Sequence, residues 1–156
     1  MTFVMRLEFV DTVCDDSLIH TYVNNQKLGY EFQVRLSYYR GHYLSCIEEL
    51  KVMVDGEEVD PTDMTFCLNN KEFTMAQIPY LISEFWKVNE AATIKVYAPG
   101  GLEDGEHTID VTLLLRNAYM YVPGNTPKHN YAVLNSSGSK TLPVRVKKGV
   151  KIDESN

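Results

Sequence analysis

Residues 100–119 read GGLEDGEHTIDVTLLLRNAY, a glycine-rich turn followed by the longest alternating stretch of the chain. The apolar residues that would share one face are Ile109, Val111, Leu113 and Leu115. The residues between them, which would share the other face, are Asp110, Thr112, Leu114 and Arg116. A period of two is typical of a β-strand with one buried face. The stretch therefore predicts a long strand in a sheet that packs on a core.

Three turn dipeptides divide much of the remaining chain into hairpins. Asp55 and Gly56 form the strongest short hairpin signal, inside ELKVMVDGEEVD at residues 49–60. The pairs at residues 24–25 and 69–70 are both Asn-Asn and stand between strand-like runs. Because asparagine tolerates a positive φ, it suits a tight turn. We therefore predict an antiparallel hairpin at each of the three positions.

Two segments give weaker signals. One is a possible helical stripe formed by Ile78, Leu81, Ile82 and Phe85. Pro79 falls inside it, so we expect one or two helical turns at most. Beyond Tyr121 the chain is rich in Pro, Gly, Ser and Asn, which predicts an extended arm or a loop with one more edge strand.

The pattern as a whole predicts an all-β fold. Eight or nine short strands without a long helix favour an antiparallel β-sandwich, immunoglobulin-like, fibronectin-like or jelly-roll-like, with a small closed barrel as the alternative. Ten tyrosines and six phenylalanines suit a pleated, half-buried surface. The 156 residues fit one domain, which we expect at residues 1–145, followed by a polar tail at 146–156.

Charge and composition argue against several classes of function. The net charge of −6, without a stripe of Lys and Arg, opposes binding to nucleic acid. The sequence has neither a signal-peptide pattern at its start nor a membrane-spanning apolar run. Cys14, Cys46 and Cys67 lie far apart, two of them in apolar contexts, as small buried thiols in a reducing compartment do. We therefore expect a cytoplasmic protein.

No motif for catalysis or metal binding stands out. The four scattered histidines are His20, His42, His107 and His129. They form no HxH or HExxH pattern, and the chain has no GxSxG or P-loop sequence. Carboxylates do occur in adjacent pairs, at residues 15–16, 48–49 and 57–58. Neighbours on a strand point to opposite faces, so such pairs do not act on one bond and are expected to be solvated. No catalytic residue, metal ligand or cofactor is predicted in this chain.

The stretch SYYRGHYLSC, residues 37–46, gathers three tyrosines, an arginine and a histidine around one glycine. If the preceding strand continues through Tyr38, that side chain faces inward, whereas Tyr39, Arg40 and His42 are expected to face outward, where they need a partner. The rings can then serve as lids over the end of the sandwich or as a patch for a protein partner, with catalysis ranking third. Tyr and Arg are enriched at interfaces because they bury large areas and keep a polar group. The residues predicted to form a partner interface are Tyr38, Tyr39, Arg40, His42, Tyr43 and Trp86.

The order of motifs resembles the small (β) subunit of bacterial C-glycoside deglycosidases. The likeness runs from about Gly29 to Tyr119 through LSYYRGHYLSCIEELKVMVDGEEV, FCLNNKEFT and FWKVNEAATIKVYAPGGLEDGEHTIDVTLLLRNAY. The resemblance implies a β-sandwich subunit that pairs with a larger TIM-barrel subunit. That partner would carry the catalytic histidine and a divalent metal, commonly manganese.

The resemblance also implies a reaction. A C-glycoside has no bridging oxygen for a general acid to protonate, so the usual two-carboxylate scheme does not apply. The family is similar in acting on 3-oxo C-glycosides, from which the aglycone leaves by elimination. We expect a non-catalytic subunit, inactive alone, of this carbon–carbon lyase. The alternative is a stand-alone carbohydrate- or ligand-binding sandwich in which Tyr38, Tyr39, Tyr43 and Trp86 stack on sugar rings.

Overall fold

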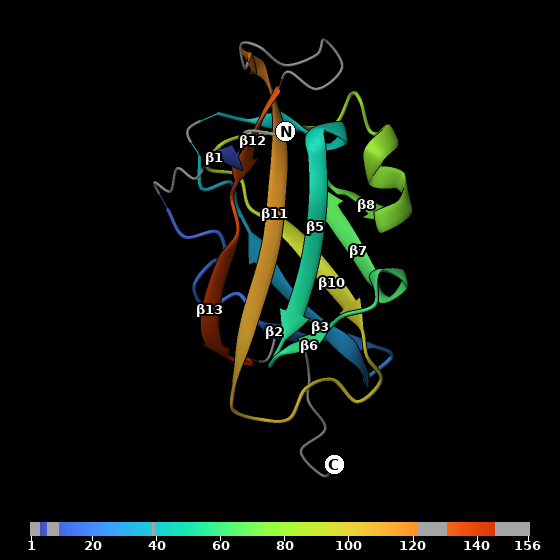
Figure 1. Ribbon diagram of the computed structural model, residues 1–156. Coiled ribbons are helices and arrows are strands. Elements are labelled where there is room, and N and C mark those ends of the chain that lie inside the picture. Colours follow the sequence, from blue (N-terminus) through green and yellow to red (C-terminus); the bar gives the residue numbers. More distant parts are fainter. Residues whose placement is uncertain (1–3, 6–9, 39, 122–130, 146–156) are drawn as a thin grey trace.

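The computed structural model describes residues 4–5, 10–38, 40–121 and 131–145. Most of its strands lie in two layers, and the long strands β11 and β5 lie in front of β10 and β3 (Figure 1). Within the described residues, an isolated bridge between Ile19 and Arg145 links the two larger sheets, but no ladder of paired strands joins them, so the fold is an all-β sandwich and not a closed barrel. The predicted fold class is confirmed.

The first layer is a six-stranded sheet, counted over the described part of the chain. Its strands are β1 (Val4–Met5), β12 (Tyr131–Asn135), β11 (Glu106–Tyr121), β5 (Ile47–Val54), β6 (Glu57–Glu58) and β13 (Gly138–Pro143). The central strand β11 pairs antiparallel with β5 on one side and with β12 and β13 on the other. Only the β1–β12 ladder, within this sheet as described, is parallel.

The second layer is a five-stranded antiparallel sheet, again counted over the described residues. Its strands, in spatial order, are β2 (Ile19–Val23), β3 (Gln26–Val34), β10 (Ala92–Tyr97), β7 (Met64–Leu68) and β8 (Lys71–Thr74). Three short 3-10 helices and a two-stranded ladder complete the described structure. These elements are η1 (Leu44–Cys46), η2 (Pro61–Asp63), η3 (Met75–Tyr80), β4 (His42–Tyr43) and β9 (Phe85–Trp86).

The three predicted hairpins are all present, as β2–β3, β5–β6 and β7–β8. Their turn residues have positive φ: 50° and 65° at residues 24–25, 52° and 84° at 55–56, and 55° and 62° at 69–70. Two consecutive positive φ values are the geometry of a type I′ turn, which matches the twist of the flanking strands. Local turn chemistry thus fixes the register of these three hairpins.

The core lies between the two layers. The alternating residues of β11 that were predicted to face inward are at most 2% exposed, and these are Ile109, Val111, Leu113 and Leu115. They belong to the same cluster as Phe32 of β3 and Phe66 of β7. Full burial of one such side chain contributes about 1.5–3 kcal/mol. The inter-sheet core therefore accounts for the orientation of the long strand.

Three expectations need correction or completion. The strand before SYYRGHYLSC ends at Val34 and does not continue through Tyr38. The region after Tyr121 contributes two strands, β12 and β13, and not one, because both form backbone ladders with β11 and each buries apolar side chains, Leu134 and Leu142 among them. The predicted tail at residues 146–156 lies outside the described residues, as do residues 122–130. In the part of the chain that is described, every helix is too short to cross a lipid bilayer.

Candidate functional site

The segment from Ser37 to Cys46 leads from β3 through β4 into η1. Its short strand pairs with β9, so that His42 lies opposite Trp86 and Tyr43 lies opposite Phe85. Beyond this ladder, the amide of Leu44 donates to the carbonyl of Glu84 at 2.9 Å. Residues 43–45 and 81–86 therefore run side by side.

Gly41 lets this ladder close tightly. A Cβ atom at this position would lie 2.6 Å from the Phe85 ring and 2.7 Å from the carbonyl oxygen of Trp86. Real Cβ atoms do not approach other atoms so closely, so the ring of Phe85 needs a glycine beneath it. Phe85 in turn packs edge-to-face with Tyr43, with 4.9 Å between ring centroids. The one glycine of the stretch thus positions a pair of aromatic rings.

Of the six predicted interface residues, three are buried, two are exposed and one lies outside the described residues. Tyr38, His42 and Trp86 are buried, with 4%, 5% and 0% exposure. Arg40 is exposed and Tyr43 is 42% exposed. Tyr39 lies outside the described residues. The inward position expected for Tyr38 is confirmed, whereas the outward position expected for His42 is wrong. Contact of any of these residues with a partner stays a prediction.

Trp86 is a core residue of this chain. Its indole packs edge-to-face on Phe66, with 5.3 Å between ring centroids. The indole N–H donates to the carbonyl of Glu90 at 2.7 Å, so its polar atom is satisfied inside the fold. A fully buried indole offers no face for stacking on a sugar, so Trp86 does not fit the sugar-stacking alternative.

His42 is an unusual buried polar residue. Neither ring nitrogen has a hydrogen-bond partner of good geometry in the described part of the chain. Burial lowers the pKa of His42, and the nearby backbone of Arg40 only partly opposes this effect. The ring of Tyr38 lies 6.4 Å away, between centroids. A neutral imidazole packed among aromatic rings is a structural group and not a poised acid or base.

His107 joins two turns. Its Nδ1 lies 2.6 Å from Oδ2 of Asp55, and its Nε2 lies 2.6 Å from the carbonyl oxygen of Glu103. Burial opposes a charge on the ring, but these two acceptors outweigh it and raise the pKa of His107. Both partners accept hydrogen bonds, so the protonated ring satisfies both. The histidine thereby ties the turn before β11 to the β5–β6 hairpin.

An exposed apolar surface lies beside the β4–β9 ladder. We call it the apolar patch and define it as Tyr43, Tyr80 and Ile82, which are exposed, together with Phe85, which is half-buried. Tyr80 is 81% exposed and Ile82 is 76% exposed. The amide of Ser45 donates to the carbonyl of Leu81 at 3.2 Å, which holds this segment against η1.

The sequence contained a signal for part of this patch. Ile82 and Phe85 belong to the stripe that suggested a helix, where they would share a buried face with Ile78. The 3-10 helix η3 ends at Tyr80, however, and only Ile78 of these three is buried. The apolar residues after the helix therefore point in directions that a helical period does not predict.

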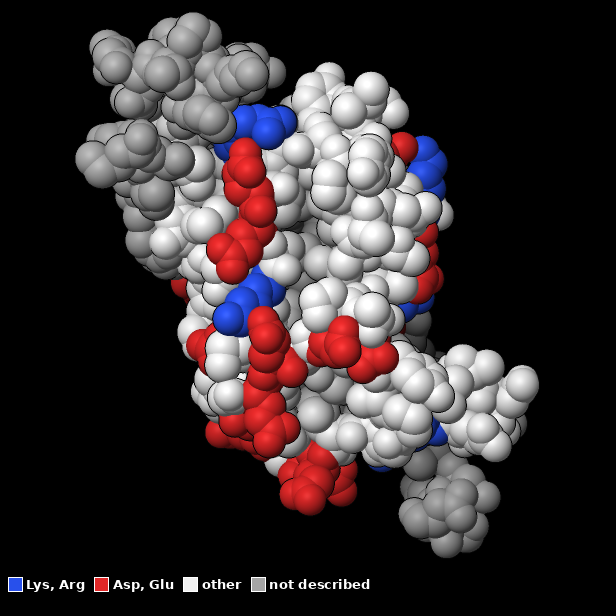
Figure 2. Space-filling view, turned by 45° about the vertical axis from the view of Figure 1, so that its right-hand side comes forward, with Lys and Arg blue, Asp and Glu red and all other residues white. Residues whose placement is uncertain are grey.

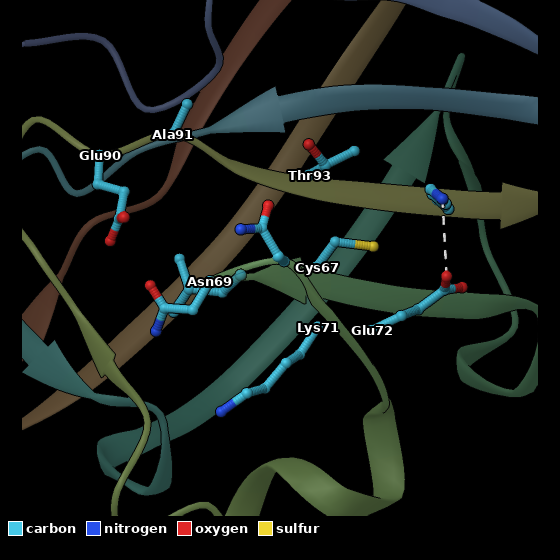
Figure 3. Close-up of a pocket in the computed structure, with 10 residues that line it drawn as sticks. Cys67, Asn69, Lys71, Glu72, Glu90, Ala91 and Thr93 are labelled. Carbon is cyan, nitrogen blue, oxygen red and sulfur yellow. Dashed lines mark ion pairs between the residues drawn. The ribbon is translucent and has the colours of Figure 1, made fainter.

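A polar groove runs along β7, β8 and β10, with a volume of about 610 Å³ (Figure 3). The side chains that line it and are labelled are Cys67, Asn69, Lys71, Glu72, Glu90, Ala91 and Thr93. Lys71 pairs with Glu84 at 2.9 Å, and Lys95 pairs with Glu72 at 3.6 Å, the pair drawn dashed in Figure 3. These paired, exposed charges are typical of a solvated sheet edge. Across the described residues, no three His, Cys, Asp or Glu side chains come together as metal ligands.

Comparisons with known proteins find relatives of this chain. A family model described as C-glycoside deglycosidase beta subunit matches residues 9–119. A C-glycoside deglycosidase beta subunit of Eubacterium cellulosolvens is 32% identical over 97 residues, which make up 62% of this chain and 66% of that protein. A 3'-dehydrocarminate deglycosidase beta subunit of Microbacterium sp is 37% identical over 97 residues, 62% of this chain and 72% of that protein. The match thus spans just under two thirds of the first relative and somewhat more of the second.

Proposed function

The chain belongs to the C-glycoside deglycosidase beta subunit family, and from this premise we propose that it is the non-catalytic subunit of a heteromeric C-glycoside deglycosidase. The observation that carries the proposal is the family match, which extends from residues before β2 into the long strand β11. A subunit so named works with a partner subunit. We propose that the partner is a larger TIM-barrel protein and that this chain is needed for its assembly and activity.

The proposed reaction is an elimination from a 3-oxo C-glycoside. The ketone acidifies the neighbouring C2–H, so that a base removes this proton. The bond between C1 and the aromatic carbon then breaks, its electron pair leaves with the aglycone, and a proton is added there. A divalent metal, commonly manganese, would supply Lewis-acid stabilisation of the enolate in the larger subunit. The name 3'-dehydrocarminate deglycosidase of one relative supports a 3-oxo substrate for this chain.

In this proposal the described residues of the chain build a rigid partner and not a reacting centre. His107 holds two turns together, and His42 and Trp86 fill the interior. The chain's contribution to activity would come from contact with the larger subunit.

The test is co-expression with the larger subunit encoded in the same genome. We expect a stable complex that cleaves 3-oxo C-glycosides, and no activity from the isolated chain. If the chain stays monomeric in the presence of that partner, the proposal fails. Titration of the isolated chain with sugars and flavonoid glycosides tests the stand-alone alternative. Micromolar binding without the partner would favour that alternative instead.

A further inference from the structure

We propose that the apolar patch, Tyr43, Tyr80, Ile82 and Phe85, is the surface with which this chain binds the larger subunit of its complex. This inference rests on the proposed function and adds to it the location of the contact. It also shifts the interface from the predicted set, in which Tyr38, His42 and Trp86 are buried, toward residues that are exposed.

The exposure of the patch is the first argument. Tyr80 and Ile82 expose 81% and 76% of their surface, and Tyr43 exposes 42%. Large apolar side chains gathered on one surface of a water-exposed protein mark interaction sites. Tyrosine in particular is enriched at interface hot spots because its ring buries a large area at a low entropic cost.

The second argument is that the patch is held rigidly. A capping box begins η3: the amide of Thr74 donates to Oε1 of Gln77 at 2.8 Å. Ile78 anchors the helix in the core at 3% exposure. The bond from the amide of Ser45 to the carbonyl of Leu81 then fixes the chain that follows. Surface side chains on a backbone fixed in this way lose little conformational freedom on binding, which favours affinity.

The charges beside the patch indicate the chemistry of its partner. The exposed carboxylates on β5 and β6 are Glu48, Glu49, Glu57 and Glu58; Glu48 pairs with Arg116 at 3.2 Å and Glu58 with Lys51 at 3.5 Å, so the negative charge is in excess but partly compensated. Glu48 and Glu49 follow Tyr43 after the single turn of η1, and we place the acidic border of the patch there. Figure 2 shows a column of mostly acidic side chains with Lys or Arg side chains among them, beside an uncharged area. The facing surface of the larger subunit should therefore be apolar with a basic rim.

The same charges argue against a second copy of this chain as the occupant. A symmetric dimer through the patch would place two identical surfaces face to face. Each would bring its own acidic border and a chain of net charge −6. Like charges brought together at an interface oppose association. A different, more basic partner fits the patch better.

The experiment measures binding of the larger subunit to full-length variants of this chain. The test variant carries Tyr80→Ser with Ile82→Ser. The matched control carries Val23→Ser with Tyr97→Ser. These two apolar residues lie on the five-stranded sheet and are 55% and 58% exposed. We expect Kd to rise at least about tenfold for the test variant and about twofold or less for the control. Circular dichroism melts establish that both variants remain folded.

A charge variant tests the acidic border. Glu49→Lys should slow association with the larger subunit at low salt, and the difference should shrink at roughly 0.5 M salt, where exposed charges are screened. The patch variant should keep its defect at both salt concentrations, because apolar burial is not screened. A charge variant with unchanged association at low salt would overturn the role of the border.

The remaining outcomes separate this inference from the proposed function. If the wild-type chain does not bind the larger subunit, the proposed function fails and this inference fails with it. If the wild type binds and the patch variant binds equally well, only this inference is overturned. It is also overturned if the patch variant abolishes self-association or sugar binding of the isolated chain while binding of the larger subunit is unchanged.

Discussion

Replacing Gly41 by alanine should destabilise the protein by about 1–3 kcal/mol, the usual cost of overpacking a filled site. The new Cβ would lie 2.6 Å from Cε2 and Cζ of Phe85 and 2.7 Å from the carbonyl oxygen of Trp86. The ring can turn away, but the carbonyl belongs to the β4–β9 ladder and moves only with the backbone. For a chain of this length, the loss corresponds to a Tm lower by roughly 2–12 °C.

Thermal unfolding followed by circular dichroism measures this loss, and fluorescence locates it. Trp86 is the single tryptophan and is fully buried, so a shifted ladder should change its native emission. Gly56→Ala is the control: it has φ of +84° and open space around the new Cβ. It should cost roughly 1 kcal/mol of backbone strain and leave the emission unchanged.

A double variant separates the two close contacts of Gly41. In a Phe85→Ala background, Gly41→Ala should cost less, because the ring that it meets is gone while the Trp86 carbonyl remains. An unchanged Tm for Gly41→Ala in the native background would refute the reasoning that Phe85 requires a glycine beneath it.

Three further predictions follow from ionisable groups. Because burial lowers the pKa of His42, its neutral form contributes stability that is lost as pH falls below about 6.5, the ordinary histidine value. The variant His42→Leu should therefore show a smaller fall of Tm between about pH 7 and pH 5 than the wild type. An equally steep fall in the variant would contradict this. His107 has a raised pKa despite its burial, because Asp55 and the Glu103 carbonyl accept hydrogen bonds from the ring. Its pairing with Asp55 therefore stabilises the fold fully below about pH 6.5, the ordinary histidine value, and this stabilisation is lost as pH rises through the raised pKa. Asp55→Asn should therefore lower the free energy of unfolding more at about pH 6 than at about pH 9. The difference should be less than about 1 kcal/mol, since the carboxylate is half exposed; equal losses at both pH values would count against it. Burial raises the pKa of the Cys14 and Cys67 thiols. Both should therefore react with a disulfide reagent at about pH 8 more slowly than glutathione does. Labelling as fast as that of glutathione would contradict the raised pKa values.

Much of the fold could be predicted because its signals are local. The alternation in β11 and the turn pairs at residues 24–25, 55–56 and 69–70 act within a few residues, and each matched the structure. The strands β12 and β13 gave only a weak signal. β13 includes Ser139, Lys140 and Thr141, and both strands are placed by ladders to β11, a partner distant in sequence, and by buried side chains such as Leu134 and Leu142.

The candidate site was harder to predict because it depends on a non-local pairing. His42 and Trp86 are 44 positions apart and become buried only when β4 meets β9. From composition alone, an arginine, a histidine and several tyrosines suggested an outward patch. Two of those side chains, Tyr38 and His42, are instead used by the core, and the exposed residues Tyr80 and Ile82 come from a segment whose period suggested a helix.

The β4–β9 ladder couples stability to the apolar patch. Because side chains alternate along each strand, the pair His42 and Trp86 points inward while the pair Tyr43 and Phe85 lies on the outer side. A substitution at the inner pair would therefore disturb the outer pair. A loss of partner binding in such a variant could then result either from local unfolding or from a lost contact with the partner. Ile82 and Tyr80 lie outside the ladder, so their substitution removes surface without this coupling. Contact with a partner subunit is best judged from those two side chains.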